Sequence, residues 1–341
     1  MHDLVLQRCQ AVFPEWRDLT AADFEFDEPK GFSSFTMGVR VASGEAGSVS
    51  PPAVLYRQLE GKDNAILDYA TERDTFLLLG EAEVAAHCHH YEETHRLEEF
   101  YVGRTLTAED VFDPDVQRKI ADALFRLHQL EPANLPKETF FELLFHKWGA
   151  MAKSVLVEHR PEFPTDEQDL CADLEKIYAP ETLTKVLRCL PDRPPAFCHN
   201  DTYHGNVMLL EDGTIKLLDF EFSCLNHIAF DFANLFAETV MEHGFAEPPH
   251  FKIGEPRFTD EDLAALIGFY VDNMDLATEE ERSEEIAKLV AETKRALLLS
   301  DYMYAMAALP LSLEPIQKIR FIPYAHQRFQ KFLAAWHVEF G

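Results

Sequence analysis

The segment FCHNDTYHGNVMLL, which begins at Phe197, gathers short polar side chains in front of an apolar run. Asp201 precedes Asn206 by five residues, and Asp219 and Glu221 follow further along the chain. A loop carboxylate can accept the proton of a hydroxyl group and orient it as a nucleophile. Carboxylate and amide oxygens are the hard ligands that Mg²⁺ prefers. These residue types predict metal-assisted transfer chemistry at one end of this segment.

A hairpin is expected to bring these groups together. Two apolar runs flank Asp212-Gly213, a dipeptide typical of a two-residue turn. With that pair at the turn centre, residue 207 pairs with 218 and Asn206 lies opposite Asp219, with Cβ atoms about 5 Å apart. Glu221 then points to the same side as Asp219 in an extended chain. The predicted hairpin forms a Mg²⁺ site at its open end.

The order H-x-D-x-x-x-x-N, hairpin, D-F is the one that phosphotransferases of the protein-kinase type use for a catalytic base and two metal ligands. The alternative is a solvated polar loop before an ordinary hairpin. Because all the elements occur in order, the sequence favours phosphoryl transfer.

Periodicity predicts the elements that position these groups. Strands are expected over 33–42, 53–59 and 96–103, and a helix over 63–80. Most of the remaining chain is expected to be helical, including a helix over 286–309 that Pro310 ends soon afterwards. We expect a lobe boundary near residue 100, with one lobe over 1–100 and a second lobe over 101–341.

Composition limits the classes of partner. The net charge of −29 disfavours nucleic acid and anionic membrane surfaces and favours a small cation. No apolar run reaches the roughly 18 residues of a membrane helix, so no membrane insertion is expected. The six cysteines form no CxxC pair, and no secretory signal is recognisable, which predicts free thiols and a cytoplasmic location.

The run HCHH, from His87 to His90, contains four potential zinc ligands, three histidines and one cysteine. Its spacing matches no common zinc pattern, and no second pair of ligands is evident. A structural or surface role is the favoured interpretation.

Three motifs resemble the choline/ethanolamine kinase family within the aminoglycoside-phosphotransferase-like group: FCHNDTYHGNVMLL, IKLLDFEFS and FDFANLFAE. RLEEFYVGRTL resembles the hinge of that family, and SDYMYAMAAL and RFIPYAHQRF its last helical segments, so the resemblance covers about 20–340. It implies an α+β, two-lobed, protein-kinase-like fold with a small N-terminal antiparallel sheet plus helix and a larger, mostly helical C-terminal lobe. The implied activity is ATP-dependent phosphorylation of choline and/or ethanolamine, the first step of phosphatidylcholine or phosphatidylethanolamine synthesis through CDP-amino alcohols.

The resemblance also implies residue roles. Asp201 takes the position of the catalytic base, Asn206 and Asp219 those of the Mg²⁺ ligands, and Glu221 that of an acidic group near the metal. Asp231 and His199 take structural positions. Asp231 is expected to accept hydrogen bonds from the backbone of the catalytic loop, and His199 to anchor that loop in the interior.

For ATP, the resemblance implies that Arg57 binds the phosphates and that Glu72, on the following helix, holds the guanidinium in place. The turn that contains Gly31, Ser33 and Ser34 is expected to cover the phosphates, and Glu99 to contact ATP at the hinge.

For the amino alcohol, the resemblance implies that Glu238 faces the cationic head and that Tyr304 and Tyr324 supply aromatic faces. The family has two tryptophans where this chain has Tyr304 and Ala307, unless another aromatic such as Tyr302 fills the gap. A reduced cage weakens trimethylammonium binding more than binding of a primary ammonium, which favours ethanolamine slightly.

Two alternatives stay open. One is a kinase of the same fold that acts on another hydroxyl, such as that of an aminoglycoside or a sugar. The other is a non-catalytic pseudokinase. The sequence also leaves open whether the protein forms a homodimer.

Overall fold

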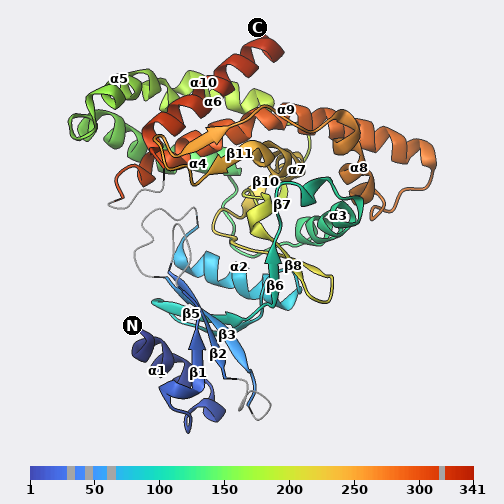
Figure 1. The fold of residues 1–341 in the computed structure, drawn as a ribbon. Helices are drawn as coiled ribbons and strands as arrows, with labels where there is room; N and C mark the ends of the chain where they lie inside the picture. Colours follow the sequence, from blue (N-terminus) through green and yellow to red (C-terminus); the bar gives the residue numbers. More distant parts are fainter. Residues whose placement is uncertain (29–34, 43–48, 60–66, 315–318) are drawn as a thin grey trace.

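A five-stranded antiparallel sheet forms the N-terminal part of the computed structural model, which describes residues 1–28, 35–42, 49–59, 67–314 and 319–341 (Figure 1). The strands lie in the order β1-β2-β3-β5-β4. Their bounds are β1 (Phe24–Phe26), β2 (Thr36–Val41), β3 (Ala53–Gln58), β4 (Cys88–Tyr91) and β5 (His95–Glu99). The predictions of strands at β2, β3 and β5 are confirmed, whereas β1 and β4 were not predicted.

Two helices cover opposite faces of this sheet. Helix α1 (His2–Val12) buries Val5 and Cys9 in one cluster with Val54 of β3. Helix α2 (Tyr69–Glu81) begins at Asp68, whose side chain accepts a hydrogen bond from the Thr71 amide over 2.9 Å. Its apolar side chains belong to the core of the helical part, so α2 lies between the sheet and that part (Figure 1).

The C-terminal part is mostly helical. Its helices are α3 (Pro114–His128), α4 (Phe140–Lys153), α5 (Thr165–Leu174), α6 (Pro180–Cys189), α7 (Ile228–Ala237), α8 (Asp260–Val271), α9 (Glu279–Leu311) and α10 (Phe321–Phe340). Every residue of α7 from Ile228 to Phe236 is buried, as in a helix that is surrounded by others. The long helix α9 packs against α7 and α10. Pro310 lies one residue before its end, in agreement with the predicted stop.

Three small sheets are formed mostly by segments that lie between these helices in the chain. They are β6 (Gly103–Thr105) with β8 (Val207–Leu210) and β9 (Ile215–Leu217), β7 (Ala196–Cys198) with β10 (Cys224–Asn226), and β11 (Met241–His243) with β12 (Phe251–Ile253). The strand predicted over 96–103 therefore ends at Glu99. A new strand starts at Gly103, where a Cβ atom would lie 2.3 Å from the carbonyl oxygen of Leu209.

The predicted register of the β8–β9 hairpin is wrong by one residue. Val207 pairs with Leu217, not with residue 218, and Leu209 pairs with Ile215. The loop holds three residues because Leu210 and Thr214 close it through a 2.9 Å hydrogen bond and Gly213, at φ 83°, takes the left-handed position. The prediction of a two-residue turn centred on Asp212-Gly213 is wrong, because this dipeptide occurs in both two-residue and three-residue loops.

All six cysteines are free thiols, as predicted. Among the residues that the structure describes, no helix combines the length and the apolar composition that crossing a membrane requires.

Candidate active site

The loop between β7 and β8 carries Asp201 and is fixed by a buried carboxylate on α7. Oδ2 of Asp231 accepts a hydrogen bond from the His199 amide, and Oδ1 accepts one from the Asn200 amide, both over 2.8 Å. His128 of α3 lies 3.0 Å from the same Oδ2. The predicted structural role of Asp231 is confirmed, because it holds the backbone immediately before Asp201.

His199 anchors the loop from the other side. Its ring is fully buried, and Nε2 lies 2.8 Å from the carbonyl oxygen of Leu218, at the end of the β8–β9 hairpin. Burial lowers the pKa of His199, so the ring is neutral at physiological pH. The predicted anchoring role is confirmed.

The carboxyl group of Asp201 is held at both oxygens. Asn206 donates through Nδ2 to Oδ2 over 2.8 Å, and the hydroxyl of Tyr304, on α9, donates to Oδ1 over 2.6 Å. Asn234 of α7 donates to the same hydroxyl over 3.2 Å and fixes Tyr304 in turn. Asp201 thus has one orientation, toward the space that α9 borders.

Neighbouring negative charges act on Asp201. Its pKa is raised well above the ordinary value by burial, and the charges of Asp219, Glu221 and Glu238 raise it further, while the Tyr304 hydrogen bond opposes the shift. Burial also raises the pKa of Tyr304, so its phenol stays protonated and remains a donor. The site is an acidic cluster that a cation would stabilise.

The backbone geometry that places Asn206 and Asp219 near Asp201 differs from the predicted one. Because the register is shifted, Leu218 takes the place opposite Asn206, and its amide donates to the Asn206 carbonyl over 2.8 Å. Asp219 leaves the strand with φ 61°, a left-handed conformation that is uncommon for residues other than glycine. The prediction that cross-strand pairing would set the two side chains opposite each other is therefore wrong.

The side chains available to a divalent cation are hard oxygen donors. Asn206 directs its amide nitrogen to Asp201, which leaves the amide oxygen for another partner. Asp219 keeps a third of its side chain exposed, and it lines a pocket together with Glu221. Two carboxylates and an amide oxygen beside an acidic group of raised pKa fit Mg²⁺.

Arg57 of β3 reaches this cluster. Its Nη1 lies 3.5 Å from Oδ1 of Asp219, and its Nε donates to Glu98 of β5 over 3.0 Å. The predicted partner, Glu72 of α2, instead lies 3.6 Å from Nη1 of Arg96. Arg96 donates to the same oxygen of Glu98 over 2.7 Å. Glu72 is thus linked to Arg57 through Arg96 and Glu98.

Glu98 is a site residue that the sequence analysis missed. It is 5% exposed and lies between two guanidinium groups, while Arg96 lies flat over the ring of Phe76, with its guanidinium carbon 3.7 Å from the ring centre. The signal was present in the alternation of RLEE, which places Arg96 and Glu98 on one face of β5, and Arg57 pairs directly with Arg96. Glu99, by contrast, is exposed at the end of β5.

The turn expected to cover the phosphates of ATP contains Gly31, Ser33 and Ser34. Gly31, Ser33 and Ser34 lie outside the described residues.

A second cluster, formed by α9, α10 and the residue that follows α7, contains the residues predicted to bind the amino alcohol. Nη2 of Arg328 donates to Oε1 of Glu238 over 2.6 Å, and Nη1 donates to Asp301 over 2.9 Å. The guanidinium carbon of Arg328 lies 5.1 Å from the ring centre of Tyr304 and 5.2 Å from that of Tyr324. Arg328 is 1% exposed, so the carboxylate expected to face a cationic ligand already holds an internal cation.

Arg328 was also missed by the sequence analysis. It follows Tyr324 by one helical turn in α10, and its Nε donates to the Tyr324 hydroxyl over 3.1 Å. Burial raises the pKa of Glu238, and the charge of Arg328 opposes that shift. The suggestion that Tyr302 completes the aromatic cage is wrong, because its ring is fully buried and packs against Phe332 in the core.

Comparisons with known proteins identify the family of the chain. The sequence model of a family described as choline/ethanolamine kinase matches residues 32–333. A choline/ethanolamine kinase of Rattus norvegicus is 28% identical over 284 residues, which are 80% of this chain and 68% of the rat protein.

Two solved structures share the fold. A choline kinase from Cryptosporidium parvum Iowa II superposes with a TM-score of 0.77 at 19% identity, covering 99% of this chain and 96% of that one. A Plasmodium vivax ethanolamine kinase superposes with a TM-score of 0.71 at 21% identity, covering 93% and 84%. The predicted α+β, two-lobed, protein-kinase-like fold is confirmed.

Proposed function

The chain belongs to the choline/ethanolamine kinase family, and from this membership we propose that it transfers the γ-phosphoryl group of ATP to the hydroxyl group of ethanolamine or choline. It is a phosphotransferase with an alcohol group as acceptor. The observation that carries the proposal is the fixed carboxyl group of Asp201, held between the Tyr304 hydroxyl and the Asn206 amide beside Asp219. Such a kinase performs the first step of phospholipid synthesis through CDP-amino alcohols.

Asp201 aligns the acceptor hydroxyl and takes its proton as the phosphoryl group moves. Phosphoryl transfer asks little covalent chemistry of the protein, so positioning and charge neutralisation dominate. Asn206, Asp219 and Glu221 would hold Mg²⁺, which when bound supplies positive charge to the phosphate oxygens of ATP. The hydrogen bond from Tyr304 keeps Asp201 in one rotamer while the acceptor approaches.

Arg57 contributes a planar guanidinium fork to the phosphates. Glu98 orients Arg57, and the link through Arg96 to Glu72 extends this support to α2. We retain the turn with Gly31, Ser33 and Ser34 and the hinge residue Glu99 as ATP contacts on the ground of the family's motifs. The division into lobes over 1–100 and 101–341 belongs to the same proposal.

The acceptor site favours a primary ammonium over a trimethylammonium group. The faces of Tyr304 and Tyr324 that would attract a quaternary cation are near Arg328, and Glu238 is paired with it. A trimethylammonium group cannot donate hydrogen bonds and depends on free aromatic faces. A primary ammonium can donate to a carboxylate oxygen that Arg328 leaves available. We therefore propose ethanolamine as the better substrate.

The test is a coupled assay of ADP release with ethanolamine and choline side by side. A higher kcat/KM for ethanolamine supports the proposed acceptor. A higher value for choline contradicts the argument from Arg328. If the protein turns over only another hydroxyl compound, such as an aminoglycoside or a sugar, the proposed acceptor is wrong but the proposed phosphoryl transfer stands.

A cytoplasmic location completes the proposal, because six free thiols suit a reducing compartment. Fractionation of cells that express the full chain checks this location.

A further inference from the structure

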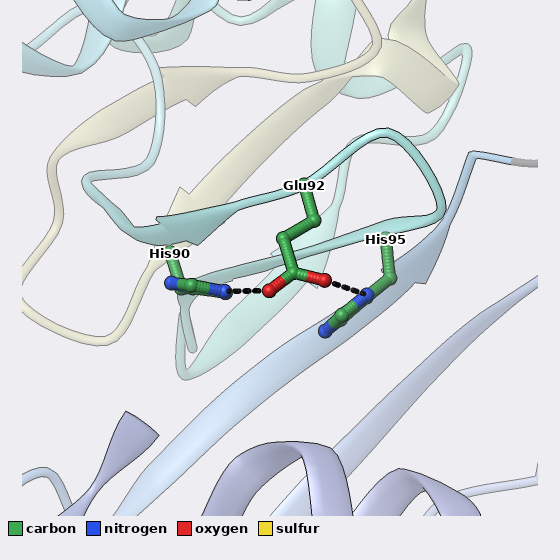
Figure 2. A group of neighbouring side chains, drawn as sticks. All are labelled: His90, Glu92 and His95. Atoms are coloured by element: carbon green, nitrogen blue, oxygen red, sulfur yellow. Dashed lines mark hydrogen bonds and ion pairs between the residues drawn. The ribbon is translucent and has the colours of Figure 1, made fainter. Parts of the chain in front are cut away.

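The hairpin that joins β4 to β5 carries three metal-ligating side chains on one side (Figure 2). His90 lies in β4, Glu92 in the turn and His95 at the start of β5. The amide of Glu92 donates to the carbonyl of His95 over 2.8 Å and closes the turn. Local backbone structure therefore fixes the spacing of the three residues.

The distances between the ligand atoms suit a single small ion. Nε2 of His90 lies 2.9 Å from Oε1 of Glu92, and Nδ1 of His95 lies 3.8 Å from Oε2 of Glu92. All three ligand atoms lie within 4.8 Å of one another. Two ligands of one tetrahedral zinc ion, each at about 2.0–2.1 Å from it, are roughly 3.3 Å apart. The carboxylate of Glu92 lies between the two imidazole rings, so a small side-chain rotation brings the three groups around one centre (Figure 2).

One ligand is rigid and the other two are adjustable. His95 is 4% exposed, and its ring stacks on Tyr56 at a centroid distance of 5.5 Å. Glu92 is exposed and His90 partly exposed, so both can adapt to an ion and admit water to it. The buried ring of His95 would hold the ion in a fixed position, and the accessible side chains of His90 and Glu92 leave a path by which the ion can enter.

The hydrogen bonding of His95 also favours a cation. The hydroxyl of Thr94 lies 3.0 Å from Nδ1 of His95. In the tautomer that accepts a hydrogen bond from Thr94, Nδ1 carries a lone pair that can bind a cation. A metal ion bound there takes this lone pair and displaces the Thr94 hydroxyl.

We propose that His90, Glu92 and His95 bind a divalent transition-metal ion of the zinc type, with water completing its coordination. Two imidazoles and one carboxylate are a typical zinc ligand set, whereas Mg²⁺ prefers oxygen ligands alone. The net charge of −29 raises the local concentration of cations around the chain. The ligands come only in part from the HCHH run: one of its histidines binds together with Glu92 and His95, which follow it.

A bound ion would crosslink β4 and β5. Glu98, which binds both Arg57 and Arg96, lies in the same strand β5 as His95. An ion at the hairpin ties this strand to its edge neighbour at the end far from the hinge. We expect the ion to raise the thermal unfolding temperature of the protein.

A second group of potential ligands, His128, Cys198 and Asp231, is not a competing site. Both oxygens of Asp231 accept backbone hydrogen bonds, and both nitrogens of His128 have hydrogen-bond partners. This cluster is a completed hydrogen-bond network in the core, so an ion there would have to break it.

The test is titration of the full chain with Zn²⁺ and Co²⁺ after removal of metals with EDTA. Millimolar Mg²⁺ is kept in the buffer to occupy the active site. We expect one ion per chain, absorption bands of four- or five-coordinate Co²⁺, and an upward shift of the unfolding temperature with Zn²⁺. If the protein binds neither Zn²⁺ nor Co²⁺, the proposal is wrong.

Variants assign the ion to the hairpin. Glu92→Gln and His90→Gln each remove a ligand at an accessible position, so folding is expected to survive, and each should weaken Co²⁺ binding at least tenfold. His146→Gln is the matched control, since His146 pairs with Glu138 over 2.9 Å on an exposed helix surface. Unchanged Co²⁺ affinity in both hairpin variants, or an equal loss in the control, places the ion elsewhere and refutes the site.

Discussion

The hydroxyl of Tyr304 donates a hydrogen bond to Oδ1 of Asp201 over 2.6 Å, from the C-terminal part of α9 to the loop before β8. The two residues are far apart in sequence, yet the contact joins the proposed base to the helix that borders the acceptor site. The residue expected to serve only as an aromatic face for the substrate thus also positions the carboxylate.

Replacing Tyr304 with phenylalanine tests this positioning role. A hydrogen bond to a charged group contributes about 1.5–3 kcal/mol, so we expect kcat to fall about 10- to 100-fold. The Tyr304 hydrogen bond lowers the pKa of Asp201, and its loss raises that pKa further. Because the base acts in its ionised form, the acid limb of the pH–rate profile moves to higher pH.

The control is Tyr302→Phe, two residues away on the same helix. The Tyr302 hydroxyl lies 3.4 Å from the carbonyl of Ile177, remote from Asp201, so the pH–rate profile should stay unchanged. A profile in Tyr304→Phe that matches the wild type would remove Tyr304 from the positioning role.

Glu98→Gln tests the support of Arg57. Removing one partner of a buried ion pair costs about 3–5 kcal/mol, and Glu98 serves two arginines. We expect a loss of this size in the free energy of unfolding and a raised KM for ATP. Glu81→Gln, at the exposed end of α2, serves as the control in urea unfolding.

The same residue predicts a pH dependence. Burial acts to raise the pKa of Glu98, but the charges of Arg96 and Arg57 prevail and hold it below the ordinary value. The stabilisation is therefore fully present above the unfolded pKa of about 4.3 and is lost as the pH falls through the folded pKa. Urea unfolding from pH 7 downward should show this acid loss in the wild type and a smaller one in Glu98→Gln.

Arg328→Met tests the internal cation of the acceptor site. The substitution leaves Glu238 and Asp301 buried without their shared partner, which should lower the free energy of unfolding by about 3–5 kcal/mol. Lys331→Met is the matched control, because its amino group lies 3.7 Å from Asp301 on a partly exposed side chain and such pairs contribute at most about 1 kcal/mol. Equal stability of the two variants would show that Arg328 does not balance these carboxylates.

Local motifs predicted the components of the site but not the contacts between them. Asp201, Asn206 and Asp219 lie on one loop and one hairpin, and short-range spacing identified them. The register failed because Asp212-Gly213 suits both a two-residue and a three-residue loop, and only Leu210 and Thr214 show which one forms. Aspartate is enriched in left-handed conformations, but this preference is too weak to predict the φ of 61° at Asp219.

Longer-range pairs could not be read from spacing alone. Glu98 holds Arg57 through the register of two strands that lie some forty residues apart, and Arg328 reaches Glu238 from another helix. A charged residue in an apolar helix pattern signals a buried pair, but the pattern does not identify the partner. Periodicity located β2, β3, β5, α2 and most of α9, because burial of one face sets the repeat, but it did not reveal β1 or β4.

The most direct test of the account is ADP release by the wild type and Asp201→Asn with ATP, Mg²⁺ and ethanolamine. The account predicts turnover that requires both Mg²⁺ and the amino alcohol, and a loss of at least about 100-fold in Asp201→Asn with ATP binding retained. Asp212→Asn, in the exposed turn of the same hairpin, should behave as the wild type. Near-normal turnover in Asp201→Asn would contradict the assignment of the base, and no turnover of any amino alcohol by the folded wild type would contradict the proposed kinase activity.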